Sequence, residues 1–157
     1  MSKISLLDGS IGQELVKRAG KAPTALWSTM VMIDQPEMVR DVHIEYFNVG
    51  ATVATTNTYP VLYDRLVREG LEDQMETLWS RAINSACAAR DAHGSGRVAG
   101  SIGPLIASYR PDICPPAAEA EESYGDIVAA LAPHVDLLLI ETMSSVDQAE
   151  GALRAAT

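Results

Sequence analysis

The stretch Ala51-Thr52-Val53-Ala54-Thr55-Thr56-Asn57-Thr58-Tyr59 runs from a short apolar segment directly into polar residues. Small and β-branched side chains predict a strand over residues 51–56. Three further segments have a similar pattern, at residues 4–7, 97–102 and 135–140. Asparagine is depleted in strands, so Asn57 marks a place where both a hydrogen-bond donor and an acceptor are useful.

The stretches between these strands have helical spacing. The clearest apolar stripe comprises Leu71, Met75, Leu78, Trp79, Ala82, Ala86 and Ala89, and two shorter ones comprise Met38, Val42, Tyr46 and Val49, and Ala120, Tyr124, Ile127, Val128 and Leu131. Capping-box spacing marks two helix starts, at Ser10 with Gln13 and at Ser144 with Asp147. Because a parallel crossover usually contains a helix, strands separated in this way pair in parallel. We therefore predict an α/β fold of four βα units, (βα)4.

The composition is that of an acidic globular protein with a single domain, residues 1–157. Lys and Arg number 12 against 21 Asp and Glu, for a net charge of −9, and 47% of the residues are hydrophobic. Clustered positive charge dominates nucleic-acid binding, so nucleic acid is excluded as a partner. The apolar run at residues 137–140 is far shorter than the roughly 20 residues that span a bilayer, so we expect no membrane partner and a cytoplasmic location. Cys87 and Cys114 suggest neither a disulfide framework nor a zinc knuckle, and we interpret them as unpaired thiols.

Polar residues and glycines follow each predicted strand, at the place where parallel α/β folds bind ligands. Asp8, Asn57 and Glu141 stand at three of these strand ends. The carboxyl ends of parallel strands lie on one face of the sheet, where the βα loops converge. The loops over residues 20–36 and 103–116 are long, which is common in functional loops. We therefore expect the three side chains at a ligand site.

Three roles fit the carboxylates of Asp8 and Glu141. They form an acid–base pair, bind one ammonium group together, or cap the helices that follow them, and spacing does not separate these roles. Burying Glu141 unpaired after an apolar strand would be costly, which favours a ligand contact for it. The histidines His43, His93 and His134 share no short spacing, and we interpret them as surface or packing residues.

Several segments, in order and spacing, resemble the homocysteine S-methyltransferase family. They are Leu6-Leu7-Asp8-Gly9-Ser10-Ile11-Gly12, Ala25-Leu26-Trp27-Ser28, Tyr46-Phe47-Asn48-Val49-Gly50-Ala51, Thr55-Thr56-Asn57-Thr58-Tyr59, Ala99-Gly100-Ser101-Ile102-Gly103-Pro104 and Glu141-Thr142-Met143. The resemblance runs from Leu6 to the last residue, and the segments together are far more specific than any one of them.

This resemblance implies a (βα)8 barrel that binds homocysteine beside a zinc ion and transfers a methyl group to the homocysteine sulfur, giving methionine. Zinc would hold the thiol as the nucleophilic thiolate. The carboxylates of Asp8 and Glu141 match those that hold the amino acid part of homocysteine in the family. By the same resemblance Thr56 and Asn57 line the mouth, and Gly9 lets the backbone approach the ligand. The small-molecule methyl donor stays open, since relatives use S-methylmethionine, S-adenosylmethionine, betaine, or methylated pterin or corrinoid carriers.

A (βα)8 barrel takes about 250 residues, so we expect this chain to be the N-terminal half of a TIM-type barrel, ending inside its fourth helix. The zinc cysteines of the family lie in the second half. The resemblance therefore assigns no metal ligand or catalytic residue here, and we expect the chain alone to be inactive. Open strand edges favour a homo-oligomer that covers them. The alternatives are a non-catalytic half-barrel that binds an amino acid or self-associates through these edges, and an open doubly wound sheet.

Overall fold

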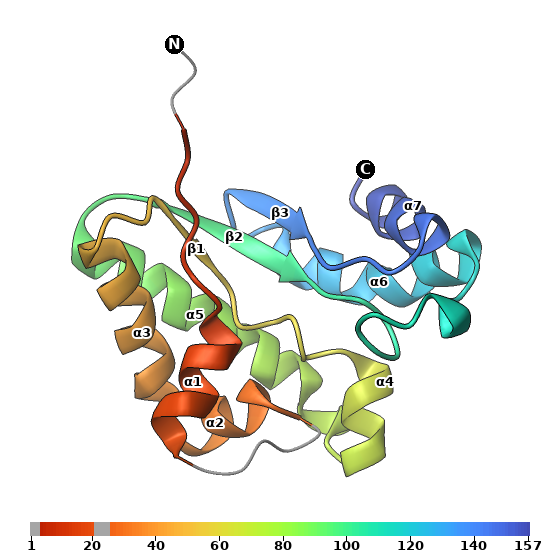
Figure 1. The fold of residues 1–157 in the computed structure, drawn as a ribbon, viewed down its shortest axis with the longest axis horizontal. Coiled ribbons are helices and arrows are strands. Elements are labelled where there is room, and N and C mark those ends of the chain that lie inside the picture. The colour runs from red at the N-terminus through yellow and green to blue at the C-terminus, as the bar shows by residue number, and fades with distance from the viewer. Residues whose placement is uncertain (1–3, 21–25) are drawn as a thin grey trace.

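The computed structural model describes residues 4–20 and 26–157, and it contains a parallel sheet covered by helices (Figure 1). The strands are β1 (Val53–Thr55), β2 (Arg97–Ile102) and β3 (Leu137–Ile140). The helices are α1 (Ile11–Ala19), α2 (Ser28–Asp34), α3 (Pro36–Asn48), α4 (Tyr63–Leu66), α5 (Met75–His93), α6 (Ala117–Leu131) and α7 (Val146–Ala155), with 3-10 turns η1 (Val67–Glu69), η2 (Glu72–Gln74) and η3 (Pro111–Ile113). Within the described ranges, every helix is too short or too polar to cross a membrane.

The strands pair in chain order, β1 with β2 and β2 with β3, and both pairs are parallel. A doubly wound sheet reverses its strand order at a switch point, whereas a barrel keeps successive strands as neighbours. The observed order confirms the predicted parallel α/β class. It also favours the barrel arrangement over the doubly wound alternative.

The predicted strand at residues 4–7 is the element that differs most. Leu7 forms a single parallel bridge to Val53, and Asp8 N donates to Val53 O at 3.0 Å. The structure therefore has three strands and one bridge where the sequence predicted four strands. β2 has the predicted bounds, whereas β1 and β3 are shorter than predicted. β1 and β3 lie on either side of β2. They are shorter because a strand near the edge of a sheet has fewer neighbours to form hydrogen bonds with at its ends.

Helices α3, α5, α6 and α7 form a helical layer, in which each helix packs on the next and contacts the sheet (Figure 1). α5 buries six side chains on one stripe, Leu78, Trp79, Ala82, Ile83, Ala86 and Ala89. This confirms most of the stripe predicted there, although the helix begins only at Met75. The prediction for Val49 is wrong: it lies just after α3, at its C-cap, and is 80% exposed.

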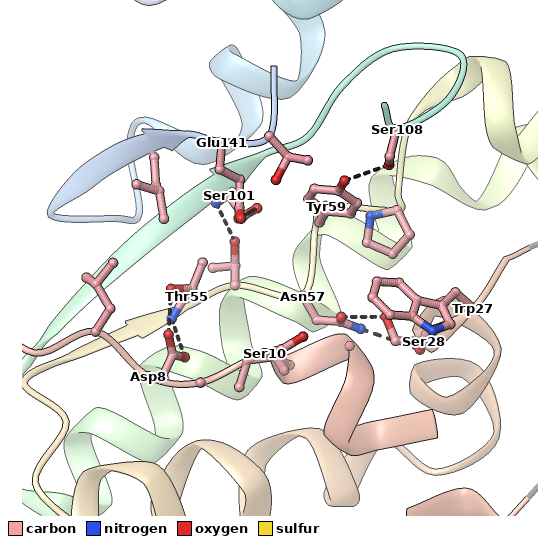
Figure 2. Close-up of a pocket in the computed structure, with 18 of the residues that line it drawn as sticks. Asp8, Ser10, Trp27, Ser28, Thr55, Asn57, Tyr59, Ser101, Ser108 and Glu141 are labelled. Atoms are coloured by element: carbon pink, nitrogen blue, oxygen red, sulfur yellow. Dashed lines mark hydrogen bonds between the residues drawn. The ribbon is translucent and has the colours of Figure 1, made fainter. Parts of the chain in front are cut away.

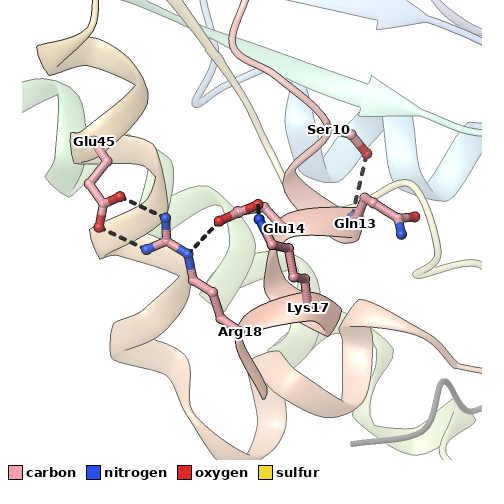
Figure 3. Close-up of polar contacts among 6 residues, drawn as sticks. All are labelled: Ser10, Gln13, Glu14, Lys17, Arg18 and Glu45. Atoms are coloured by element: carbon pink, nitrogen blue, oxygen red, sulfur yellow. Dashed lines mark hydrogen bonds and ion pairs between the residues drawn. The ribbon is translucent and has the colours of Figure 1, made fainter. Parts of the chain in front are cut away.

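Helix α1 is fixed at both ends by polar contacts (Figure 3). Ser10 Oγ accepts a hydrogen bond from Gln13 N at 3.4 Å, which confirms the predicted N-cap. Near the other end, Arg18 donates to Glu14 at 2.8 Å and to both carboxylate oxygens of Glu45 at 2.7 and 2.6 Å. These bonds join α1 to α3, and they hold the pKa of the Glu45 carboxyl below its ordinary value.

The second predicted capping box is displaced by one residue. Ser145, not Ser144, is the N-cap of α7, and its Oγ accepts from Gln148 N at 3.1 Å. Gln148 Oε1 in turn accepts from Ser144 N at 3.3 Å. In the predicted loop at residues 20–36, the structure places helix α2, while residues 21–25, with Ala25 of the second segment quoted above, lie outside the described residues.

Candidate functional site

A cleft of about 450 Å³ opens at the carboxyl ends of the strands (Figure 2). Its walls come from the three strand ends, the start of α1 and α2, and the loops after β1 and β2. The cleft is lined by all five residues predicted to bind substrate, Asp8, Gly9, Thr56, Asn57 and Glu141. Folding therefore brings together residues that are more than 130 positions apart in the sequence (141 − 8 = 133).

The carboxylate of Asp8 is hydrogen-bonded to Thr55, the last residue of β1. Its Oδ2 accepts from Thr55 N at 2.7 Å and its Oδ1 accepts from Thr55 Oγ1 at 2.6 Å (Figure 2). The side chain is 2% exposed. Because Ser10 is the N-cap of α1, the capping role that the sequence left open for Asp8 is excluded.

A buried histidine lies behind Asp8. His43 Nδ1 is 3.6 Å from Asp8 Oδ2, and within the described ranges neither ring nitrogen has a hydrogen-bond partner. The packing role predicted for His43 is confirmed, since the residue is fully buried in α3. Its position beside Asp8 was missed, because no sequence spacing links a helix residue to a strand end that precedes it by 35 residues (43 − 8 = 35).

Glu141 faces the cleft from the end of β3. Its Oε1 accepts a hydrogen bond from Ser101 Oγ at 2.6 Å, and the residue is half-buried. No described residue bonds Oε2 of Glu141, which leaves this oxygen for a ligand. Ser145 caps α7, so the capping role is excluded for Glu141 as well.

Thr56 and Asn57 form the floor of the cleft, and both are almost fully buried. Asn57 Oδ1 accepts from Ser28 Oγ at 2.7 Å, and its Nδ2 donates to Ser28 O at 3.4 Å. Thr56 Oγ1 accepts from Ser101 N at 3.0 Å. These bonds tie the end of β1 to α2 and β2, so the two side chains shape the cleft. Direct contact of either with a ligand stays a prediction.

Close packing against Tyr46 explains why residue 9 is a glycine. A Cβ atom at this position would lie 2.5 Å from the hydroxyl oxygen of Tyr46, closer than such atoms approach. Burial of Tyr46 raises the pKa of its phenol. Because Gly9 has no side chain, the Tyr46 ring from α3 can pack against it. The approach of a ligand to the Gly9 backbone stays a prediction.

Strained backbone gathers around the cleft. Trp27, Tyr109 and Thr142 have positive φ angles of 49°, 61° and 58°, and all three line the cleft. Residues other than glycine rarely adopt this conformation, and such outliers cluster at functional sites. The sequence carries no sign of them, because none is a glycine or asparagine.

One wall of the cleft is aromatic and basic. Tyr59 and Trp27 meet edge to face at 6.4 Å between ring centroids, and Tyr59 OH is 2.7 Å from Ser108 Oγ. The Arg65 guanidinium lies 5.3 Å from the centroid of the Tyr59 ring. Sequence reasoning missed Arg65, which lies far from any strand end. It also did not single out Ser108, although Ser108 stands in the long loop over residues 103–116. Ser101 could have been found, since it stands at the end of a predicted strand.

The two cysteines lie away from the cleft. Cys87 Sγ is 3.7 Å from His134 O, and burial raises the pKa of this thiol. Cys114 Sγ is 3.4 Å from Arg110 O. In residues 4–20 and 26–157, no three His, Cys, Asp or Glu side chains come together in a way that could hold a metal ion.

Comparisons with known proteins agree with this geometry. The family model described as Homocysteine S-methyltransferase matches residues 5–157. Homocysteine S-methyltransferase of Escherichia coli (strain K12) is 32% identical over 94% of this chain and 52% of its own length. Homocysteine S-methyltransferase YbgG of Bacillus subtilis (strain 168) is 28% identical over 95% of this chain and 53% of its own length. The chain thus spans about half the length of the curated relatives it matches.

Solved structures show the same correspondence. The metallated form of the homocysteine methyltransferase MmuM from Escherichia coli superposes with a TM-score of 0.84 and 30% identity, over 96% of this chain and 58% of that one. The oxidized form also has a TM-score of 0.84, at 31% identity. The fold class is confirmed, since the chain corresponds to about half of a TIM-barrel methyltransferase. The chain belongs to the homocysteine S-methyltransferase family.

Proposed function

We propose that this chain forms the homocysteine-binding part of a homocysteine S-methyltransferase. In that reaction the homocysteine sulfur takes a methyl group from a small-molecule donor and becomes the thioether of methionine. The observation that carries the proposal is the meeting of Asp8 and Glu141 in one cleft, with neither serving as a helix cap. Family membership supports the choice of substrate.

The two carboxylates suit the ammonium group of an amino acid. An ionised carboxylate has about four positions that accept hydrogen bonds. Thr55 fills two of them on Asp8, and Ser101 fills one on Glu141. The positions that remain can accept N–H bonds from one ammonium group, which explains why two acidic residues face a common space.

Zinc, which the family resemblance implies, would keep the sulfur as a thiolate, because a free thiol has a pKa of about 8.5. The residues present do not fit such a site, since the described part of the chain brings no metal-binding group together and both cysteines lie outside the cleft. We therefore assign this chain the binding step only. We expect no methionine from the chain alone with zinc and S-methylmethionine, and its detection by mass spectrometry would overturn this part of the proposal.

Ligand-induced stabilisation tests the binding step. A ligand that binds only the folded state raises the melting temperature. We expect homocysteine to raise that of the wild type, and to raise that of Glu141→Gln by less than half as much. Glu122→Gln, the same change on the exposed face of α6, should respond as the wild type does. The absence of a shift in the wild type, or an equal shift in Glu141→Gln, would contradict the proposal.

Exposed apolar side chains favour a second candidate, a half-barrel that self-associates through its edge. Ile4, Leu6 and Leu7 are 91%, 55% and 43% exposed along the segment beside β1. Light scattering after size exclusion separates the two candidates, because self-association predicts a stable dimer whose mass and melting temperature do not respond to homocysteine. A cytoplasmic location, which suits the two free thiols, belongs to the first proposal.

A further inference from the structure

The charged side chains of the cleft do not neutralise one another. Among the described residues, the charged groups that line the cleft are the carboxylates of Asp8 and Glu141 and the guanidinium of Arg65. The carboxylates bond to Thr55 and Ser101, whereas Arg65 Nη2 donates to Pro104 O at 2.7 Å. Opposite charges that share a poorly solvated space attract strongly. Within the described ranges Arg65 forms no ion pair with either carboxylate, so the cleft offers both signs of charge to a ligand.

Among the described residues, Arg65 differs from the other arginines in being half-buried without an acidic partner. Five arginines pair with acidic residues outside the cleft, namely Arg18, Arg40, Arg90, Arg110 and Arg154. The other three, Arg68, Arg81 and Arg97, are exposed to solvent. Arg65 has no acidic partner within the described ranges, although the chain has an excess of nine acidic residues. Its Nε is buried and lacks an acceptor in the same part of the chain. A half-buried guanidinium without an anion is costly, and an anionic ligand group would remove that cost.

The guanidinium is also held in place before any ligand arrives. It lies over the Tyr59 ring, 5.3 Å from the ring centroid, and its bond to Pro104 O fixes one end. Tyr59 is itself held by Ser108 and Trp27. Little side-chain freedom remains to be lost on binding, and a guanidinium fork matches the two oxygens of a carboxylate.

We propose that Arg65 binds the carboxylate of a zwitterionic amino acid whose ammonium group lies at Asp8 and Glu141. This inference rests on the proposed function and deepens it, by naming the residue that recognises the second charge of the ligand. Homocysteine and an amino acid methyl donor both carry such a carboxylate. The experiment therefore uses both.

A thermodynamic cycle between protein and ligand tests the pairing. The affinities of homocysteine and of 3-aminopropane-1-thiol, which is homocysteine without its carboxylate, are measured by titration calorimetry on the wild type and on Arg65→Gln. A charge-assisted pair is worth about a factor of ten in affinity. We expect Arg65→Gln to lower the affinity for homocysteine about tenfold and to change the affinity for 3-aminopropane-1-thiol by less than about twofold. Arg68→Gln removes the same charge one turn away, at an exposed residue outside the cleft, and should change neither.

S-methylmethionine and its counterpart without the carboxylate form the second arm. A selective loss in this pair alone would place Arg65 at the methyl donor and would overturn the inference that Arg65 shares one ligand with Asp8 and Glu141. Arg65→Lys guards against a folding defect, because it keeps the charge and loses only the fork. We expect the ligand affinity of Arg65→Lys to lie between those of the wild type and Arg65→Gln.

An equal loss for both members of each pair, or no loss in either pair, would overturn the role of Arg65 while leaving the proposed function intact. Failure of the wild type to bind homocysteine would overturn the proposed function and, with it, this inference.

Discussion

The helical layer and the cleft differ in what they bury. In the layer, the fully buried side chains are mostly apolar, as Val39, Leu78, Ile127 and Leu131 show. Around the cleft, many of the buried side chains are polar, and they include Ser28, Thr56, Asn57, Thr58 and Ser101. The layer removes apolar surface from water, which is the main stabilising contribution to folding.

The cleft contains several groups that cost stability. Three of its residues have strained backbone, and the Arg65 guanidinium and the His43 ring nearby have nitrogens without partners among the described residues. Such costs persist only where the surrounding structure holds them in place. We infer that the layer carries the stability and that the cleft carries the recognition. Substitutions in the two regions should therefore separate stability from binding.

The largest expected loss of stability comes from Leu131→Ala in the layer. Leu131 is fully buried on α6, and its side chain packs against Gly100 of β2. Removing it leaves a cavity, which lowers the free energy of unfolding by about 3 kcal/mol. Urea denaturation measures this loss. Homocysteine affinity, measured well below the melting temperature, should change by less than about twofold.

Leu153→Ala is the matched control, since Leu153 on α7 is 57% exposed. Its free energy of unfolding should change by less than about 0.5 kcal/mol. A large loss of homocysteine affinity in Leu131→Ala would contradict the division between layer and cleft.

Asp8→Asn, unlike Leu131→Ala, should weaken homocysteine binding as well as stability. The amide can accept from only one of the two Thr55 donors, so we expect the free energy of unfolding to fall by about 1–2 kcal/mol. Homocysteine affinity should fall at least about tenfold, because the charge that faces the ammonium group is lost. Calorimetry measures the second effect. Asp73→Asn, an exposed change in η2, should leave both quantities unaltered, and unchanged affinity in Asp8→Asn would remove Asp8 from the proposed site.

The sequence predicted the central strand β2 to the residue, because its apolar run is bounded by Gly96 and Gly103 on both sides. The segment at residues 4–7 has the same kind of composition but pairs only through Leu7. Composition describes the tendency of a segment to extend, whereas pairing also depends on which neighbours reach it. The number of strands was therefore less predictable than their parallel direction.

The residues of the candidate site also divide into those that the sequence predicted and those that it did not. Asp8 and Glu141 were predictable, because the ends of parallel strands must share one face of the sheet. His43 and Arg65 were not, because tertiary packing of helices α3 and α4 brings them to the cleft. The resemblance to a family implies an amino acid as the ligand, whereas spacing alone left three roles open for the carboxylates.

The smallest expected effect lies outside both regions, at the surface contact between α1 and α3. Hydrogen bonds from Arg18 hold the pKa of Glu45 below its ordinary value of 4.5 (Figure 3). The folded state then binds fewer protons than the unfolded state as the pH falls below that value. The stabilisation is present above pH 4.5 and is lost as the pH falls through the lower pKa of the folded state.

Glu45→Gln should remove this contribution. Urea denaturation is expected to show the wild type slightly more stable than Glu45→Gln at about pH 7, with the difference shrinking toward about pH 3. Added salt should also reduce the difference, because both side chains are exposed to solvent. Homocysteine affinity should stay the same, since Glu45 does not line the cleft. A stability difference that is equal at both pH values would show that Glu45 acts through packing and that its charge is irrelevant.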